Sequence, residues 1–227
     1  MYWSDEGFLL SKFNFNENSI IVETFTLNHG KCSGIVYGGT SKKISNYLQL
    51  GNKIHVNLKT KNDNKLGYFK VEIIDAISPF FFNDNKKINC LIWSLNLLRL
   101  VLPELLSYAS IYTLFSNFLN ELKHNKDWIV HYIFWEINLL RKIGFDMNLT
   151  PDSVSKTYPE KNMVTANIDD EEVNIPSFIF EKKFNNVDSK SIYYALVFIG
   201  KFLEKKILIP NNLNYPISRK KLEMFFK

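Results

Sequence analysis

The residue types that most often carry catalysis or bind a metal are few and scattered in this sequence. The four histidines (His29, His55, His124 and His131) occur among predicted strands and helices without metal-ligand spacing. Cys32 and Cys90 lie in apolar runs with no Cys-x-x-Cys pair, which is typical of buried thiols in a reducing compartment. Because a structural zinc needs four nitrogen or sulfur ligands, we predict no metal site and no cofactor.

Other catalytic patterns are also missing from the sequence. The segment Gly38-Gly39-Thr40-Ser41-Lys42 lacks the residue order of a phosphate-binding loop, and no serine stands in a nucleophile elbow. Glu136 falls within the apolar stripe of a predicted helix, and we interpret it as a buried, paired carboxylate rather than a proton-transfer group. These observations favour a binding protein over an enzyme; an enzyme assembled from dispersed residues is an alternative.

Lysines interleaved with aromatic residues are the side chains with a recognisable chemical use. The lysines are Lys31, Lys42, Lys43, Lys53, Lys59, Lys61 and Lys70, and the aromatic residues are Tyr37, Tyr47, Tyr68 and Phe69. A basic groove with aromatic platforms is how small β-barrels bind single-stranded nucleic acid. Phe69 is predicted to lie in the core, whereas Lys42 and Lys43 follow a Gly-Gly turn and are expected to project from a loop.

Five short β-branched runs must position these side chains. The runs cover residues 8–13, 19–26, 32–37, 53–58 and 66–77, each closed by Asn, Gly or Asp. The first three indicate an antiparallel meander, and a short helical piece at 44–48 precedes the fourth. Five such strands within about 75 residues predict a small closed barrel of the OB-fold type.

After Ser78-Pro79 the apolar period changes from 2 to 3.6, which predicts helices. We expect helices over 88–102, 108–123, 127–143 and 192–203, and a last one from Pro216 to Phe226. Residues 148–172 show no helical period and are predicted to be irregular, with a short hairpin of 163–166 and 173–175. The predicted fold is α+β: an OB-fold barrel (1–78) and an all-helical domain (79–227) with an irregular insertion at about 148–175 and no zinc site.

Composition indicates a folded protein, and its modest positive charge is also what a solvated, lysine-rich surface would give. The chain of 227 residues is 46% hydrophobic and carries a net charge of +5, with basic ends around an acidic middle that would suit a polyanion. Asp5 and Glu6 stand where an export signal would be basic and then apolar. The uncharged run 105–120 is shorter than the roughly 20 residues of a membrane span. We therefore expect a cytoplasmic protein that does not bind membranes.

Several segments resemble the RecO family of bacterial recombination mediators. They are the opening W-x-D-E-G, the strand E-N-S-x-I-V-E-x-F-T with its H-G turn, G-G-x-S-K-K, W-E-x-x-L-L-R-K-I-G-F at 135–145, and F-L-E-K-K-x-L-I-P at 202–210. The resemblance implies binding of single- and double-stranded DNA, strand annealing, and recombinase loading with RecR onto DNA coated with single-stranded-DNA-binding protein. RecO relatives often carry zinc-binding cysteines near 152–157 and an Arg before the Gly-Gly pair. Here the cysteines are absent and Tyr37 takes the place of that Arg.

The resemblance implies association with the nucleoid, and it favours a DNA-binding role for the lysines of the predicted barrel. The DNA-binding residues would be Lys31, Lys42, Lys43, Lys53, Lys59 and Lys70. The helical domain would receive the acidic C-terminal tail of single-stranded-DNA-binding protein, with Arg141 and Lys142, beside Leu139-Leu140, as its contacts; complementing the helix dipole is the alternative role for these two cations. The barrel alone would equally suit an RNA-binding or ribosome-associated adaptor, which is our alternative function.

Overall fold

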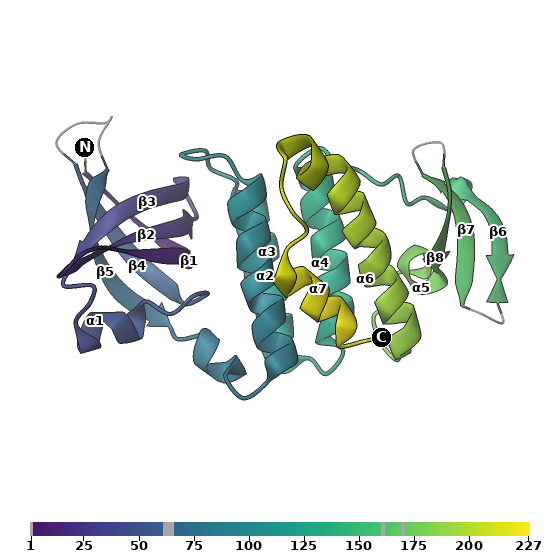
Figure 1. The fold of residues 1–227 in the computed structure, drawn as a ribbon, viewed down its shortest axis with the longest axis horizontal. Coiled ribbons are helices and arrows are strands. Elements are labelled where there is room, and N and C mark those ends of the chain that lie inside the picture. The colour runs from purple at the N-terminus through teal and green to yellow at the C-terminus, as the bar shows by residue number, and fades with distance from the viewer. Residues whose placement is uncertain (1, 61–65, 160–161, 169–170) are drawn as a thin grey trace. The chain divides into compact units, whose positions relative to one another are not determined.

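The computed structural model describes residues 2–60, 66–159, 162–168 and 171–227 (Figure 1). The chain divides into two compact units, Met1–Thr113 and Leu114–Lys227, and each is described by itself. The domain division predicted from the sequence, 1–78 and 79–227, stays a prediction.

The first unit is built on a closed five-stranded barrel, as predicted (Figure 1). Its strands are β1 (Tyr2–Asn16), β2 (Ser19–Thr26), β3 (Gly30–Tyr37), β4 (Lys53–Lys59) and β5 (Gly67–Asp75). Strands β1, β2 and β3 form the expected antiparallel meander. Beyond it the order is β1-β2-β3-β5-β4, so that β5 lies between β3 and β4 and runs parallel to β3.

Alternating inward side chains from every strand fill the barrel. Leu9, Val22, Val36, Ile54 and Val56 are each at most 2% exposed. Phe69 is 4% exposed, which confirms its predicted place in the core. Its ring lies against Gly34, where a Cβ atom would come within 2.6 Å of it. Gly34 therefore lets β3 approach the aromatic ring at the centre of the barrel.

Lys42 and Lys43 are not in a loop, contrary to our prediction, because the helix before β4 begins at them. Helix α1 (Lys42–Tyr47) is capped by Ser41, whose side chain accepts a hydrogen bond from the backbone N–H of Ile44. Serine is a favoured N-cap because its oxygen satisfies a free donor of the first turn. The sequence pattern hid this start, because the two lysines add nothing to an apolar stripe.

Helical residues that follow the barrel complete the first unit. The short helix η1 (Ser78–Phe81) leads to α2 (Asn85–Val101), capped by Asp84. Tyr112, in the first turn of α3 (Ala109–His124), packs on Phe8 and Phe25 at ring-centroid distances of 5.0 and 5.6 Å. The outer side of β1 and β2 is thus covered by residues that follow the barrel in sequence.

The second unit contains most of the predicted helices. They are the rest of α3, α4 (Trp128–Lys142), α6 (Ser189–Leu203) and α7 (Ile217–Met224), close to the predicted ranges. Gly144 ends α4 with a φ of 97°, as expected for glycine after a helix. Asp188 caps α6 by accepting a hydrogen bond from the backbone N–H of Ser191, and aspartate is a favoured N-cap residue. A π-helical turn η4 (Glu204–Leu208) and the 3-10 turn η5 (Ile209–Asn211) follow α6.

The segment predicted to be irregular is a three-stranded antiparallel sheet preceded by the turn η2 (Pro151–Ser153) and followed by a short helix. Strands β6 (Val154–Tyr158), β7 (Met163–Ile168) and β8 (Glu171–Pro176) pair in that order, and α5 (Ser177–Glu181) comes next. The predicted hairpin is β7–β8, whereas β6 and α5 were not predicted. The pattern missed β6 because four of its five residues are exposed and give no apolar alternation.

Glu136 is a buried, paired carboxylate, as interpreted from the sequence. It is 0% exposed on α4, and its Oε2 lies 3.2 Å from Nη2 of Arg219 on α7, which is equally buried. Arg219 also donates to the carbonyl of Leu196 on α6 at 2.7 Å. The ion pair therefore joins three helices of the second unit. Within the described residues, no helix is both long and apolar enough to cross a membrane.

Candidate nucleic-acid interface

The outward face of strands β1, β4 and β5 brings together the side chains that could contact nucleic acid. Strand pairing sets them in cross-strand rows: a first row of Tyr2, Lys59 and Tyr68, and a second row of Ser4, Asn57 and Lys70. Residues in one row are about 5 Å apart across the sheet, and the rows are about 7 Å apart along the strands. Neither row contains a carboxylate. We call these two rows the barrel face.

A stacked pair of tyrosines continues the first row onto β3. The rings of Tyr37 and Tyr68 lie 4.8 Å apart at 12° to each other. They remain 62% and 44% exposed. A hydrogen bond between the two side chains raises the pKa of Tyr37 above its ordinary value. The pair thus offers a flat aromatic surface beside Lys59, which is the arrangement needed to stack an unpaired base.

A groove of about 780 Å³ joins this aromatic pair to α1. It opens there because β3 and β5 pair only at Gly34–Gly67 and Ile35–Tyr68, so the end of β3 is not paired with β5. Lys43 and Tyr47 line the groove from α1, and Lys59 and Lys70 line it from the strands. We call it the barrel groove. Its size falls within the range of ligand sites.

The predicted DNA-binding lysines differ in their availability. Lys43, Lys59 and Lys70 line the barrel groove, with Lys70 Nζ 3.2 Å from an oxygen of Glu72. Lys42 is exposed on α1, and Lys53 is paired with Glu6 at 2.8 Å.

Lys31 is only 9% exposed, and its Nζ donates to the carbonyl of Arg99 at 2.9 Å. We therefore leave Lys31 out of the proposed interface, because a phosphate contact would cost this buried hydrogen bond. Lys61 lies outside the described residues.

Asp5 and His29, which lie in segments that carry the family resemblance, stabilise the structure of the barrel. The carboxylate of Asp5 accepts from the backbone N–H groups of Asn28 and His29 and lies 2.9 Å from Nδ1 of His29. Burial raises the pKa of Asp5, but these hydrogen bonds outweigh it and leave the pKa below its ordinary value. Trp3 stacks on His29 at 4.0 Å. The cluster fixes the β2–β3 turn.

The described residues contain no candidate metal centre. No three His, Cys, Asp or Glu side chains among them are placed to hold a metal ion. Cys32 and Cys90 are buried free thiols, as the sequence predicted. Burial raises the pKa of Cys32 to about 11, which makes the thiol a weak nucleophile at neutral pH.

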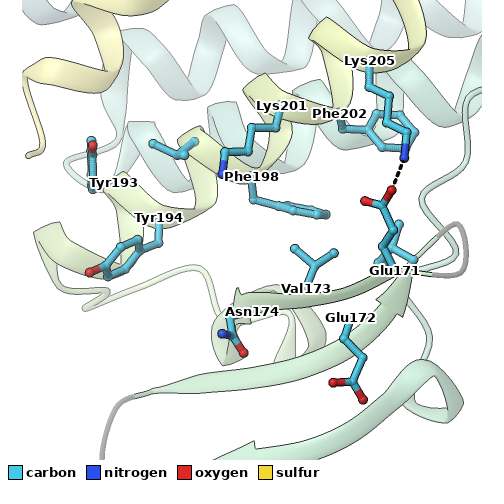
Figure 2. Close-up of a pocket in the computed structure, with 12 residues that line it drawn as sticks. Glu171, Glu172, Val173, Asn174, Tyr193, Tyr194, Phe198, Lys201, Phe202 and Lys205 are labelled. Atoms are coloured by element: carbon cyan, nitrogen blue, oxygen red, sulfur yellow. Dashed lines mark hydrogen bonds and ion pairs between the residues drawn. The ribbon is translucent and has the colours of Figure 1, made fainter.

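The second unit has a separate pocket of about 470 Å³ between β8 and α6 (Figure 2). Val173 and Phe198 face each other across it. Lys201 and Lys205 stand on its helix side and Glu171 and Glu172 on its strand side, with Lys205 and Glu171 paired at 2.7 Å. We call it the β8–α6 pocket.

Comparisons with known proteins match both parts of the chain to one family. The model described as "Recombination protein O N terminal" matches residues 1–77, and "Recombination protein O C terminal" matches residues 83–211. The chain belongs to the RecO family. Its curated relatives named "DNA repair protein RecO" include one from Wolbachia pipientis subsp. Culex pipiens, 27% identical over 95% of this chain and 96% of the relative. Another, from Ehrlichia chaffeensis, is 30% identical over 69% of this chain and 64% of the relative.

RecO membership assigns the chain to DNA repair by recombination and confirms the resemblance. It does not identify the residues that bind the family's partners. Arg141 is about half exposed and pairs with Asp146 at 3.2 Å, and Lys142 is exposed. Leu139 and Leu140, which we expected to line an apolar pocket beside them, are both 0% exposed. Assigning the tail contact to Arg141 and Lys142 stays a prediction.

Sequence reasoning missed Tyr2 and Asn57 as members of the barrel face. Tyr2 precedes the first apolar run, so the predicted strand began six residues too late. Asn57 lies opposite Lys70 and accepts a hydrogen bond from the Tyr2 hydroxyl at 3.4 Å. Only strand register brings these residues together, and a single sequence gives no direct signal for register.

Proposed function

We propose that this RecO-family protein is a recombination mediator. It binds single- and double-stranded DNA, anneals complementary strands, and acts with RecR to load recombinase onto DNA coated with single-stranded-DNA-binding protein. The observation that carries the proposal is the barrel groove, where three lysines surround a stacked, exposed tyrosine pair. No metal, cofactor or hydrolysis is part of the proposal.

The chemistry of the groove suits strand annealing. Lysines that neutralise phosphates reduce the repulsion between two strands and release counterions. Tyrosine rings that stack on bases hold a strand while its Watson–Crick edges stay free to pair, and this stacking does not depend on the base sequence. Together these contacts keep one strand extended and available to a complement.

The test is strand annealing by the full chain, with and without the coating protein. Two double variants, Lys42→Ala/Lys43→Ala and Lys59→Ala/Lys70→Ala, remove two charges each from the groove region. Lys86→Ala/Lys87→Ala, at the start of α2, removes the same charge elsewhere in the first unit. Each phosphate contact contributes about 0.7 to the salt slope on single strands, so each groove variant should lower the slope by about 1 to 1.5. The α2 variant should leave it unchanged.

Three results would count against the proposal. If the groove and α2 variants have equal slopes of affinity against salt, the DNA binds elsewhere. The basic segment Arg219–Lys221 would then be the next candidate, with Lys220 and Lys221 as its exposed cations. Absence of annealing would remove the mediator function. Higher affinity for RNA than for DNA of the same sequence would favour the RNA-binding adaptor, because the 2′-hydroxyl distinguishes the two.

We also propose that the second unit receives the acidic C-terminal tail of single-stranded-DNA-binding protein. The chemistry required is an apolar pocket beside a cation, because such a tail ends in an apolar side chain and a carboxylate. Arg141 and Lys142 supply the cations predicted from the sequence. The β8–α6 pocket supplies apolar walls together with Lys201.

A tail peptide titrated against the full chain separates the two sites. Arg141→Ala and Lys201→Ala each remove one cation, and Lys126→Ala removes one at an exposed position after α3. If one of these two variants loses affinity for the peptide and the Lys126 variant keeps the parent affinity, the residue changed in that variant identifies the site. Unaltered affinity in both would place the tail contact outside these residues.

A further inference from the structure

The strands that form the barrel face change their charge along their length. Beyond the second row, a third row contains Glu6, His55 and Glu72, and Asp75 lies opposite Lys53 in a fourth. Glu72 and Asp75 are exposed. Lys53 is paired with Glu6, so these two side chains together add no net charge to this end of the strands. We call the exposed carboxylates Glu72 and Asp75 the acidic border.

The acidic border lies at the distance where the second strand of a duplex would run. The third and fourth rows are about 7 and 14 Å from the second row, given the rise of about 3.4 Å per residue. In B-form DNA the two backbones are separated by a minor groove about 6 Å wide and a major groove about 12 Å wide. With one backbone on the lysine rows, the other would pass over these carboxylates.

We propose that the barrel face accepts one nucleic-acid strand and rejects a duplex, with Glu72 and Asp75 as the residues that determine this specificity. The inference rests on the proposed function, since it assumes that the barrel groove holds a strand. The exposed Tyr37–Tyr68 surface acts in the same direction, because a base can stack on it only when the base is unpaired.

This specificity favours release of the duplex from the barrel face once two strands have annealed. A single strand held across the lysine rows meets one carboxylate of the groove lining, Glu72, whose charge is offset by the neighbouring Lys70. Once pairing places a second backbone over the acidic border, repulsion between phosphates and carboxylates weakens the hold of the face on the product. Duplex bound by the full chain is then held by other surfaces of the protein.

The test compares duplex and single-strand affinity in charge variants of the full chain. Glu72→Gln/Asp75→Asn removes two charges from the acidic border. Glu17→Gln/Glu104→Gln removes the same charge from exposed positions of the first unit outside the four rows. We expect the ratio of duplex to single-strand affinity to rise about three- to ten-fold in the border variant at low salt and to return toward the parent value as salt screens the charges.

Using the ratio separates this inference from the proposed function. Neutralising Glu72 also frees Lys70 and so strengthens both affinities, but the ratio rises only if the border acts on the second strand. An unchanged ratio, or an equal rise in the control variant, would overturn the inference while leaving the groove as the single-strand site. If Lys59→Ala/Lys70→Ala leaves single-strand affinity unaltered, the proposed site and this inference both fail.

Discussion

At the scale of single residues, the Tyr37–Tyr68 pair tests whether the DNA site proposed in the barrel groove contacts bases as well as phosphates. Base stacking on an aromatic side chain contributes about 1–3 kcal/mol per base. We predict that Tyr37→Ala and Tyr68→Ala each weaken single-strand binding by about this amount. The two Phe variants should bind as the parent does, because the ring remains. Fluorescence anisotropy with a labelled oligonucleotide measures the change.

The salt dependence of these variants distinguishes stacking from charge effects. Replacing a tyrosine removes no charge, so the slope of affinity against salt should stay that of the parent. Equal losses in the Phe and Ala variants would mean that the hydroxyls, and not the rings, make the contact. Phe80→Ala, an exposed aromatic outside the groove, is the matched control and should bind normally.

Asp5 gives a prediction about pH. Its pKa in the folded protein is lowered, because the hydrogen bonds from His29 and the β2–β3 turn outweigh burial. A lowered pKa stabilises the fold above the unfolded value of about 3.9 and ceases to do so as pH falls through the folded value. We predict that Asp5→Asn lowers the free energy of unfolding by about 2 kcal/mol at pH 7.

The difference between Asp5→Asn and the parent should shrink as pH falls below about 4. Urea unfolding at neutral and acid pH measures it. Asp75→Asn, on the exposed end of β5, should stay within about 0.5 kcal/mol of the parent throughout. A deficit for Asp5→Asn that persists undiminished into acid would show that the loss comes from packing and not from the carboxylate's charge.

The sequence shows which residue types could form a DNA site, but it does not show which of those residues lie together in the fold. The interleaving of lysines and tyrosines is visible in the sequence, and Lys59, Lys70, Tyr37 and Tyr68 indeed meet. Lys31 could not be excluded in advance, since its position at a strand end resembles that of an exposed lysine. Its burial depends on a carbonyl 68 residues later, at Arg99.

At the scale of elements, the buried Arg219–Glu136 pair holds α7 against α4 and α6. Removing one partner of a buried pair leaves an uncompensated charge, which costs about 3–5 kcal/mol. We predict a loss of this size for Arg219→Ala, measured by urea unfolding. Replacing both partners, as in Glu136→Leu/Arg219→Met, should restore much of the stability, because an apolar pair fills the same space and leaves no unpaired charge between them.

The comparison of these two variants tests the cause of the loss. If the double variant is as unstable as Arg219→Ala, the hydrogen bond from Arg219 to the Leu196 carbonyl, and not the charge on Glu136, accounts for the effect. Lys220→Ala, on the exposed side of the same helix, is the control and should be within about 0.5 kcal/mol of the parent.

Elements with a strong apolar period were predictable from the sequence, and elements without one were not. Helices α2, α4 and α6 carry long apolar stripes, and each is bounded by an N-cap Asp or by a Gly or Pro after its last turn. Their predicted ranges are therefore nearly right. Strand β6 is almost wholly exposed, and α1 contains no buried residue. Local pattern fails where an element is held by its neighbours rather than by its own apolar face.

At the scale of the whole molecule, the change of period near residue 79 marks where strands give way to helices, which need not be where one folding unit ends. Phe8 and Phe25 are 1% and 0% exposed, and both contact Tyr112. Lys31 is satisfied by Arg99. These contacts come from residues beyond 78 and lie inside the compact unit Met1–Thr113.

We therefore predict that a fragment of residues 1–113 folds cooperatively and that a fragment of residues 1–78 does not. The shorter fragment exposes Phe8 and Phe25, each of which contributes about 1.5–3 kcal/mol when buried, and it leaves Lys31 without the Arg99 carbonyl. Small domains are stable by only about 5–15 kcal/mol, so losses of this size remove most of the margin. Thermal unfolding followed by circular dichroism compares the two fragments. Equal melting temperatures would mean that the barrel closes by itself, and that the division predicted from the sequence, not the contact-based one, describes how this chain folds.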